Sequence, residues 1–200
     1  MANLILVRHG ESEWNQKGLW TGLTDIKLSE KGKEEARLAG EKLKGFPIGL
    51  AYTSVLLRAK QTLDEIKNIL NLNIPTIENK ALNERDYGIY TGKNKWEIQK
   101  EVGNEQFQKI RRGWDVPIEN GESLKDVHNR VVPYYESEIL PKLEEGKNVL
   151  ICAHGNSLRA LVKFLERISD EDVLNLDIAT GEVYLYNIDG NGSIVSKKIL

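Results

Sequence analysis

Two segments of the chain share one pattern: a fully apolar strand, one further residue, and then histidine and glycine. The first is "LILVRHG" at residues 4–10 and the second is "VLICAHG" at residues 149–155. Apolar runs without polar alternation are typical of strands buried on both faces of a parallel sheet. Because ligands of open α/β sheets bind beyond the carboxyl ends of the strands, we expect His9 and His154 to meet at that edge.

Amphipathic helices alternate with the apolar strands. We expect strands at 4–7, 50–54 and 148–153, and a C-terminal hairpin around "DGNG". We expect helices after Ser29 and Ser123, after the second strand, and from about Ser157. This alternation indicates an α/β fold, a three-layer α/β/α arrangement with a mainly parallel central sheet and helices on both faces.

The segment at 81–120 differs from the rest of the chain. It is polar, punctuated by glycine and only partly periodic. Long irregular excursions inside compact domains are usually functional or disordered. We therefore predict one domain over residues 1–200, with 81–120 as a cap-like insertion that carries short helices.

Composition excludes several classes of function. The chain has 40% hydrophobic and 29% charged residues and a net charge of −2, which is typical of a soluble globular protein and argues against general binding of nucleic acid. No apolar run is long enough to span a membrane, and Arg8 interrupts any signal-peptide core. The lone cysteine, Cys152, fits a reducing compartment, so we expect a cytoplasmic location and a buried thiol.

The paired histidines suggest phosphoryl chemistry. The chain has no Walker-type loop, no H-E-x-x-H motif and no carboxylate cluster with metal-ligand spacing, so we expect no metal. A neutral imidazole can attack a phosphoryl group while arginines pair with its oxygens, and Arg8 and Arg58 are placed to do so. Glu84 is the carboxyl best placed for acid and base catalysis.

Each of these residues also has a purely structural interpretation. A single histidine at a strand end is more often a hydrogen-bonded structural residue, and Glu84 to Asp86 in isolation would be a solvated run of charges. His128, which lacks the histidine-glycine context, is expected on the surface or in packing. Only the assembled set of residues favours catalysis.

Several longer motifs resemble those of a known family. "VRHGESEWN", "TGLTDIKLSEKG", "TSVLLRAKQT", "NERDYGIYTGKNK", "RRGWD" and "AHGNSLRALVK" span nearly the whole chain. They are similar to motifs of the histidine phosphatase superfamily, and within it of the cofactor-dependent phosphoglycerate mutases, which use 2,3-bisphosphoglycerate. The resemblance implies that this bisphosphate primes the enzyme and that no metal takes part.

The resemblance also implies roles for individual residues. His9 corresponds to the phosphorylated nucleophile, Glu84 to the general acid and base, and the phosphate pocket is completed by Arg8, Arg58 and His154. Contacts to phosphate and substrate are implied for Asn15, Thr21, Gly22, Gly155 and Asn156. The substrate carboxylate and second phosphate are expected at Tyr87, Lys95, Arg111 and Arg112.

The cationic residues distinguish two activities. A mutase has to retain a doubly phosphorylated intermediate, which requires a cationic wall opposite His9, and "KNK" and "RR" supply one. We therefore expect interconversion of 2-phosphoglycerate and 3-phosphoglycerate in glycolysis and gluconeogenesis. The alternative is a broad-specificity phosphatase that uses the same phosphohistidine, and a more remote one is a non-catalytic anion-binding module.

The sequence also departs from the family pattern at three places. The stretch between "RRGWD" and "NGESL" and the tail after "SKKIL" are short, which is expected to open the pocket entrance and alter subunit contacts. Asp86 replaces a histidine of the family motif, which we expect to matter little. A monomer and a homodimer are both compatible with the sequence.

Overall fold

A central sheet of six strands, in the order β3-β2-β4-β1-β5-β6, organises the computed structural model, which describes all 200 residues. The strands are β1 (Ala2–Arg8), β2 (Leu50–Thr53), β3 (Thr76–Glu78), β4 (Val149–Ala153), β5 (Val183–Ile188) and β6 (Ile194–Ile199). The first four are parallel, and β5 and β6 form the antiparallel hairpin expected around "DGNG". The predicted mainly parallel sheet is therefore confirmed.

Strands β1 and β4 are direct neighbours. Arg8 pairs with Ala153 in the parallel register, and the His9 amide donates a hydrogen bond to the Ala153 carbonyl at 2.9 Å. His9 and His154 consequently leave the sheet side by side at its carboxyl edge, as the repeated pattern predicts.

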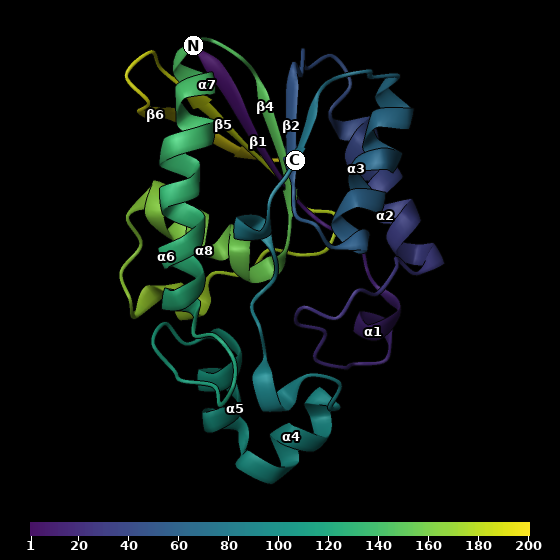
Figure 1. Ribbon diagram of the computed structural model, residues 1–200, viewed down its shortest axis with the longest axis vertical. Helices are drawn as coiled ribbons and strands as arrows, with labels where there is room; N and C mark the ends of the chain where they lie inside the picture. Colours follow the sequence, from purple (N-terminus) through teal and green to yellow (C-terminus); the bar gives the residue numbers. More distant parts are fainter.

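Helices cover both faces of the sheet (Figure 1). The helices α2 (Glu30–Lys42) and α3 (Leu57–Leu70) pack on one face, while α6 (Leu124–Tyr134), α7 (Leu140–Glu144) and α8 (Gly155–Glu166) pack on the other. Along β1, Leu4 and Leu6 join the core under α6 and α8, whereas Ile5 and Val7 join the core under α2 and α3. The strand is buried on both faces, which explains its continuous apolar sequence.

The helix starts agree with the predicted caps at two sites and differ at a third. Ser29 caps α2 by accepting from the Gly32 amide, and Ser123 caps α6 by accepting from the Asp126 amide, both at 3.1 Å. Helix α8 begins at Gly155 rather than near Ser157. The reason is that Ser157 Oγ accepts from the His154 amide at 3.0 Å, so the serine lies inside the first turn.

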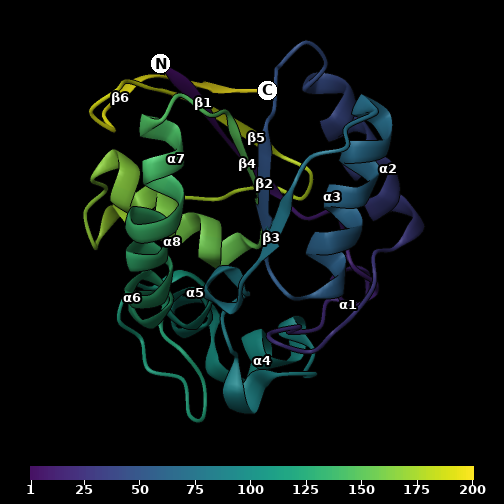
Figure 2. The same ribbon diagram turned by 45° about the horizontal axis from the view of Figure 1, so that its top comes forward.

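The segment at 81–120 lies beyond the carboxyl edge of the sheet, below it in Figures 1 and 2. It contains two single-turn 3₁₀ segments and the helices α4 (Lys95–Val102) and α5 (Asn104–Arg112). A separate apolar cluster joins these helices to Trp20 of the β1–α2 connection. Its buried members are Trp20, Tyr87, Ile98, Phe107, Ile110 and Ile118. The segment is thus packed against the rest of the chain through a core of its own.

A close backbone crossing fixes the loop that follows His9. A Cβ atom on Gly10 would lie 2.1 Å from the Gly32 carbonyl oxygen, and one on Gly32 would lie 2.0 Å from the Glu11 carbonyl oxygen. Only glycine fits at either position. The loop therefore rests directly on the first turn of α2.

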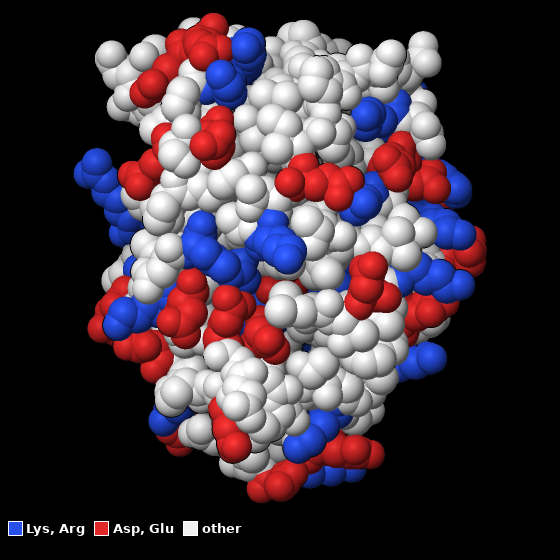
Figure 3. All heavy atoms as spheres, viewed as in Figure 1, with Lys and Arg blue, Asp and Glu red and all other residues white.

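Charged side chains of both signs are spread over the surface. Figure 3 shows Lys and Arg side chains mixed with Asp and Glu over one face, in keeping with the net charge of −2. None of the helices has the length and hydrophobicity needed to cross a membrane. Cys152 is fully buried, and half-buried His128 packs between Trp114 and Phe164.

Candidate active site

One polar cavity opens at the carboxyl edge of the sheet. Two of its 16 lining residues are hydrophobic, while six are cationic and two are acidic. The lining includes every residue expected from the sequence except His154: Arg8, His9, Asn15, Thr21, Gly22, Arg58, Glu84, Tyr87, Lys95, Arg111, Arg112, Gly155 and Asn156. Such a cavity favours a small, multiply charged anion.

His9 is held as a neutral imidazole with its lone pair on Nε2. Its Nδ1 lies 2.7 Å from the Gly10 carbonyl, which can only accept, so Nδ1 carries the proton. Nε2 is left unprotonated, and Arg58 Nε donates toward it at 3.3 Å. Burial, and then the charges of Arg58 and Arg8, hold the pKa of His9 well below its usual range. The nitrogen that faces Arg58 is therefore available as a nucleophile.

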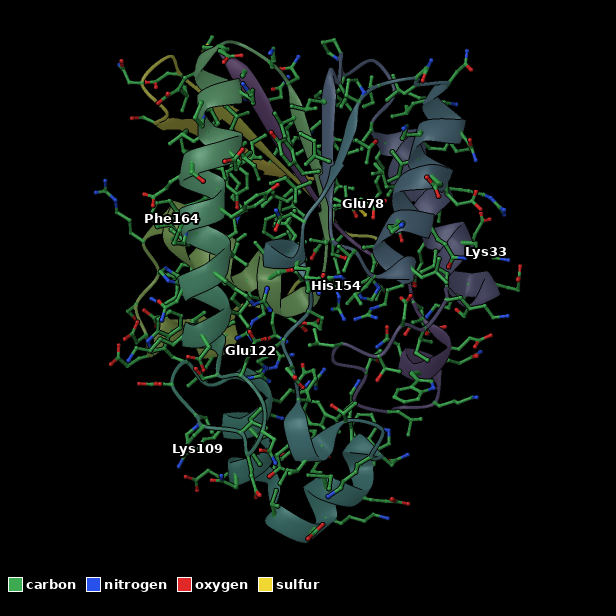
Figure 4. The ribbon with its side chains drawn as sticks, viewed as in Figure 1. Lys33, Glu78, Lys109, Glu122, His154 and Phe164 are labelled. Atoms are coloured by element: carbon green, nitrogen blue, oxygen red, sulfur yellow. The ribbon has the colours of Figure 1, made fainter.

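His154 lies behind the cavity wall rather than on it. The side chain is fully buried, and its Nε2 is 2.7 Å from Ser54 Oγ, which follows β2. Figure 4 shows His154 near the centre of the molecule, between the sheet and the α4 and α5 helices. Burial and the charge of Arg58 also lower the pKa of His154, so this ring is neutral as well.

Two guanidinium groups flank the His9 ring. The Arg58 side chain is buried and is fixed by donation to the carbonyls of Thr24 at 3.0 Å and Gly22 at 2.9 Å. Arg8 donates to the Ile178 carbonyl, while its buried Nε has no partner within the protein. Donors held in this way are suited to the oxygens of a phosphoryl group beside His9.

Glu84 is a buried carboxylate within reach of both histidines. Its Oε1 accepts from the Arg85 amide at 2.7 Å and from the Asn156 amide and Asn156 Nδ2 at 3.2 and 3.0 Å. One ligand-type atom from each of Glu84, His9 and His154 lies within 4.8 Å of the others. This spacing would permit a metal ion, but the adjacent Arg8 and Arg58 charges oppose one and favour an anion.

A second cationic group faces the cavity from the insertion. Lys95 Nζ lies 5.7 Å from the centre of the Trp20 ring, and burial, with the charges of Arg111 and Arg8, lowers the lysine pKa to about 8. Burial and the charge of Arg112 lower the pKa of Arg111. These residues lie on α4 and α5, so the insertion supplies one wall of the cavity.

The sequence gives no site role to two lining residues, Trp20 and Asp177, and offers Arg159 only as one of the scattered cations that could help to hold an anion. Asp177 binds Arg112 at 2.9 Å, and Trp20 lies beneath Lys95. Arg159 lies three residues after Asn156 on the same helix, so that contact is local, but its sequence position gives no sign that it reaches α5. The tryptophan in "GLWTG", directly before Thr21 and Gly22, was the one signal available.

Comparison with known proteins identifies the family. The profile of the histidine phosphatase superfamily (branch 1) matches residues 4–198. The chain belongs to this superfamily. A histidine phosphatase superfamily assignment agrees with the two neutral histidines and the arginine-lined cavity.

Two phosphoglycerate mutases align with this chain over almost its entire length. The 2,3-bisphosphoglycerate-dependent phosphoglycerate mutase of Parvibaculum lavamentivorans is 50% identical over 98% of this chain and 95% of its own. The phosphoglycerate mutase of Schizosaccharomyces pombe is 46% identical, with the same coverage. Among solved structures, Bacillus stearothermophilus YhfR is 27% identical with a TM-score of 0.84, over 97% of this chain and 94% of its own.

Proposed function

We propose that this protein is a 2,3-bisphosphoglycerate-dependent phosphoglycerate mutase. It interconverts 2-phosphoglycerate and 3-phosphoglycerate, in glycolysis and gluconeogenesis, through a phosphohistidine at His9. The names of relatives at about 50% identity support this activity. Because glycolysis takes place in the cytoplasm, we propose that location, and we propose a monomer or homodimer that needs no metal.

The observation that carries the proposal is the second cationic group on the wall of the cavity that holds His9. A phosphoglycerate has a phosphate at one end and a carboxylate at the other. Arg8 and Arg58 suit the group transferred to His9, and Lys95, Arg111 and Arg112 suit the carboxylate or second phosphate. A phosphatase that admits many esters has no need for this second group.

The neutral His9 ring performs the transfer in this scheme. Its Nε2 attacks phosphorus as the bond from phosphorus to the substrate oxygen breaks, and Glu84 gives its proton to the departing oxygen. Arg8 and Arg58 stabilise the charge on the transferring oxygens. In the reverse step Glu84 takes the proton from the accepting hydroxyl.

A fit between the cavity and a bisphosphate is supported by unpaired donors. Arg8 Nε is buried without a partner in the protein, and the six cationic side chains exceed the two acidic ones. When bound, 2,3-bisphosphoglycerate supplies the phosphoryl group that primes His9. The residues that would hold it are Arg8, Arg58, Lys95, Arg111 and Arg112.

A single assay separates this activity from its alternatives. The purified protein is given 3-phosphoglycerate with and without catalytic 2,3-bisphosphoglycerate, and both 2-phosphoglycerate and free phosphate are followed. We expect isomerisation that depends on the bisphosphate and exceeds phosphate release. Phosphate release without isomerisation would support the phosphatase, and no turnover would support the anion-binding module.

A further inference from the structure

The buried Arg159 side chain of α8 joins several parts of the cavity wall. Its Nε donates to the Leu176 carbonyl at 2.9 Å, and one terminal nitrogen, Nη2, donates to the carbonyls of both Val173 at 2.7 Å and Arg112 at 2.9 Å. The other terminal nitrogen, Nη1, donates to Asn156 Oδ1 at 2.9 Å. With four of its five N–H groups committed to these partners, Arg159 is a poor candidate for direct binding of substrate.

The contact with Arg159 fixes the orientation of the Asn156 amide. A guanidinium has donors and no acceptor, so the oxygen of the amide has to face Arg159. The NH₂ group then faces the other way, and it donates to Glu84 Oε1 at 3.0 Å and to the Tyr87 hydroxyl at 2.8 Å. If the amide were flipped, its NH₂ group would face the N–H of Arg159 and its oxygen would face Glu84 Oε1. Two donors would then meet at one end and two acceptors at the other.

The two oxygens of Glu84 are unequal, and the orientation of the Asn156 amide adds to the difference, because a flipped amide would place an acceptor against Oε1 and favour a proton there. Oε1 accepts three N–H groups, from the Arg85 amide and from the amide and side chain of Asn156. No lone pair on Oε1 is then left for a proton, so a protonated Glu84 carries it on Oε2. The Tyr87 hydroxyl already accepts from Asn156, which leaves its own proton free to point into the cavity.

We propose that Arg159 is a positioning residue that, through Asn156, places the transferable proton of Glu84 on Oε2 and turns Tyr87 into a hydrogen-bond donor toward the substrate. This role deepens the proposed function and rests on the acid role of Glu84. As the bond between phosphorus and the leaving oxygen breaks, the Oε2 proton moves to that oxygen and Glu84 becomes a carboxylate.

Two phosphate esters with different leaving groups test the proposal. p-Nitrophenolate departs readily without a proton, whereas the alkoxide of glycerol 3-phosphate requires one, and neither ester has a carboxylate that depends on Arg112. We expect Arg159→Met to lose about 10- to 100-fold in kcat/KM on glycerol 3-phosphate and about threefold or less on p-nitrophenyl phosphate. Equal losses on both esters would overturn the proposal.

Val173→Ala is the matched control because it loosens the segment that Arg159 also holds without touching Asn156. We expect its losses on the two esters to be equal. Glu84→Gln separates the proposal from the function on which it rests. If Glu84→Gln loses kcat/KM mainly on glycerol 3-phosphate but Arg159→Met does not, Glu84 is the acid and Arg159 does not position it. If Glu84→Gln loses kcat/KM equally on both esters, Glu84 is not the acid.

Asn156→Asp provides a second variant in case Arg159→Met does not fold. An aspartate of the same size can still accept from Arg159 but places a carboxylate against Glu84. We expect Asn156→Asp to lose more kcat/KM on glycerol 3-phosphate than on p-nitrophenyl phosphate, because Glu84 Oε1 loses its side-chain donor and faces an acceptor instead. Equal losses on both esters would count against the arrangement.

Discussion

The rings of His9 and His154 meet edge to face, with their centroids 4.9 Å apart and their planes at 61°. Burial, and then the charge of Arg58, lowers the pKa of both rings, and the nearby His9 adds to the effect on His154. A second positive charge in this space would be repelled, so the pair is held neutral while Arg58 provides the fixed charge. A neutral nucleophile beside a permanent cation suits attack on a phosphate dianion.

The first prediction concerns the nucleophile. We expect His9→Ala to abolish isomerisation and to remove any acid-labile, alkali-stable phosphoryl label acquired from 2,3-bisphosphoglycerate. The measurement is radiolabelling followed by acid and alkali treatment. His128→Ala is the matched control, and we expect it to retain both label and activity. Label in His9→Ala equal to that in the unchanged protein would show that another residue carries the phosphoryl group.

The second prediction follows from the lowered histidine pKa values. In the folded protein His9 and His154 stay neutral, whereas in the unfolded chain they bind protons below about pH 6.5. The unfolded state then binds more protons, so the free energy of unfolding falls as the pH drops below that value. While both rings remain neutral in the folded state, the slope approaches about 2.7 kcal/mol per pH unit.

NMR of the ring protons checks the same prediction site by site. We expect the signals of His9 and His154 to show no titration between pH 6 and 8 in the protein without phosphate. Urea unfolding at several pH values gives the slope. A midpoint near pH 6.5 for His9 would contradict the neutral ring described above.

The third prediction concerns Lys95. Its pKa of about 8 means that the ammonium form is present below that pH and is lost as the pH rises through it. We expect the KM for 3-phosphoglycerate to rise above pH 8. Lys95→Met should raise KM about tenfold at pH 7, which is the order expected for one lost charge-assisted hydrogen bond.

Lys95→Arg is the informative control because arginine keeps its charge throughout this range. We expect the rise in KM above pH 8 to be absent in this variant. Steady-state kinetics from pH 6.5 to 9.5 would measure it. The same rise in Lys95→Arg would assign the pH dependence to another group.

The fourth prediction concerns Arg130, which anchors the segment before Glu84. Arg130 donates to the carbonyls of Ala81, Asn83 and Glu84 and forms a bidentate pair with Glu122. We expect Arg130→Gln to lower the free energy of unfolding by about 2–3 kcal/mol and to reduce kcat, since Glu84 loses its support. Urea denaturation measures the stability change, and Arg37→Gln, at an exposed ion pair, should have little effect.

The strands next to the site could be predicted because a short run of apolar residues is enough to indicate a strand buried on both faces. The continuous apolar residues of β1 and β4, and the caps Ser29 and Ser123, depend on neighbours within a few positions. Strand β3 went unpredicted because its three residues are exposed and carry no apolar pattern. The π-helical turn at Tyr135–Ile139 also went unpredicted, although Pro133, which lacks an amide donor, precedes it.

The site residues also differ in whether nearby sequence is enough to predict them. His9 and Arg8 share one motif, and Glu84 and Arg58 each lie in a recognisable stretch of sequence. Arg159 and Asp177 act through contacts with α5, which is distant in the chain, so no local pattern marks them. The position of His154 behind the cavity wall likewise depends on Ser54, which follows a different strand, β2.

The crossing of Gly10 and Gly32 links the nucleophile to a helix that takes no part in the chemistry. A side chain on Gly10 would displace the backbone of Gly32, and one on Gly32 would displace the backbone of Glu11, so either substitution disturbs the loop after His9 although Gly32 does not line the cavity. An engineer who transplants the "VRHG" motif into another α/β scaffold must therefore transplant the first turn of α2 with it.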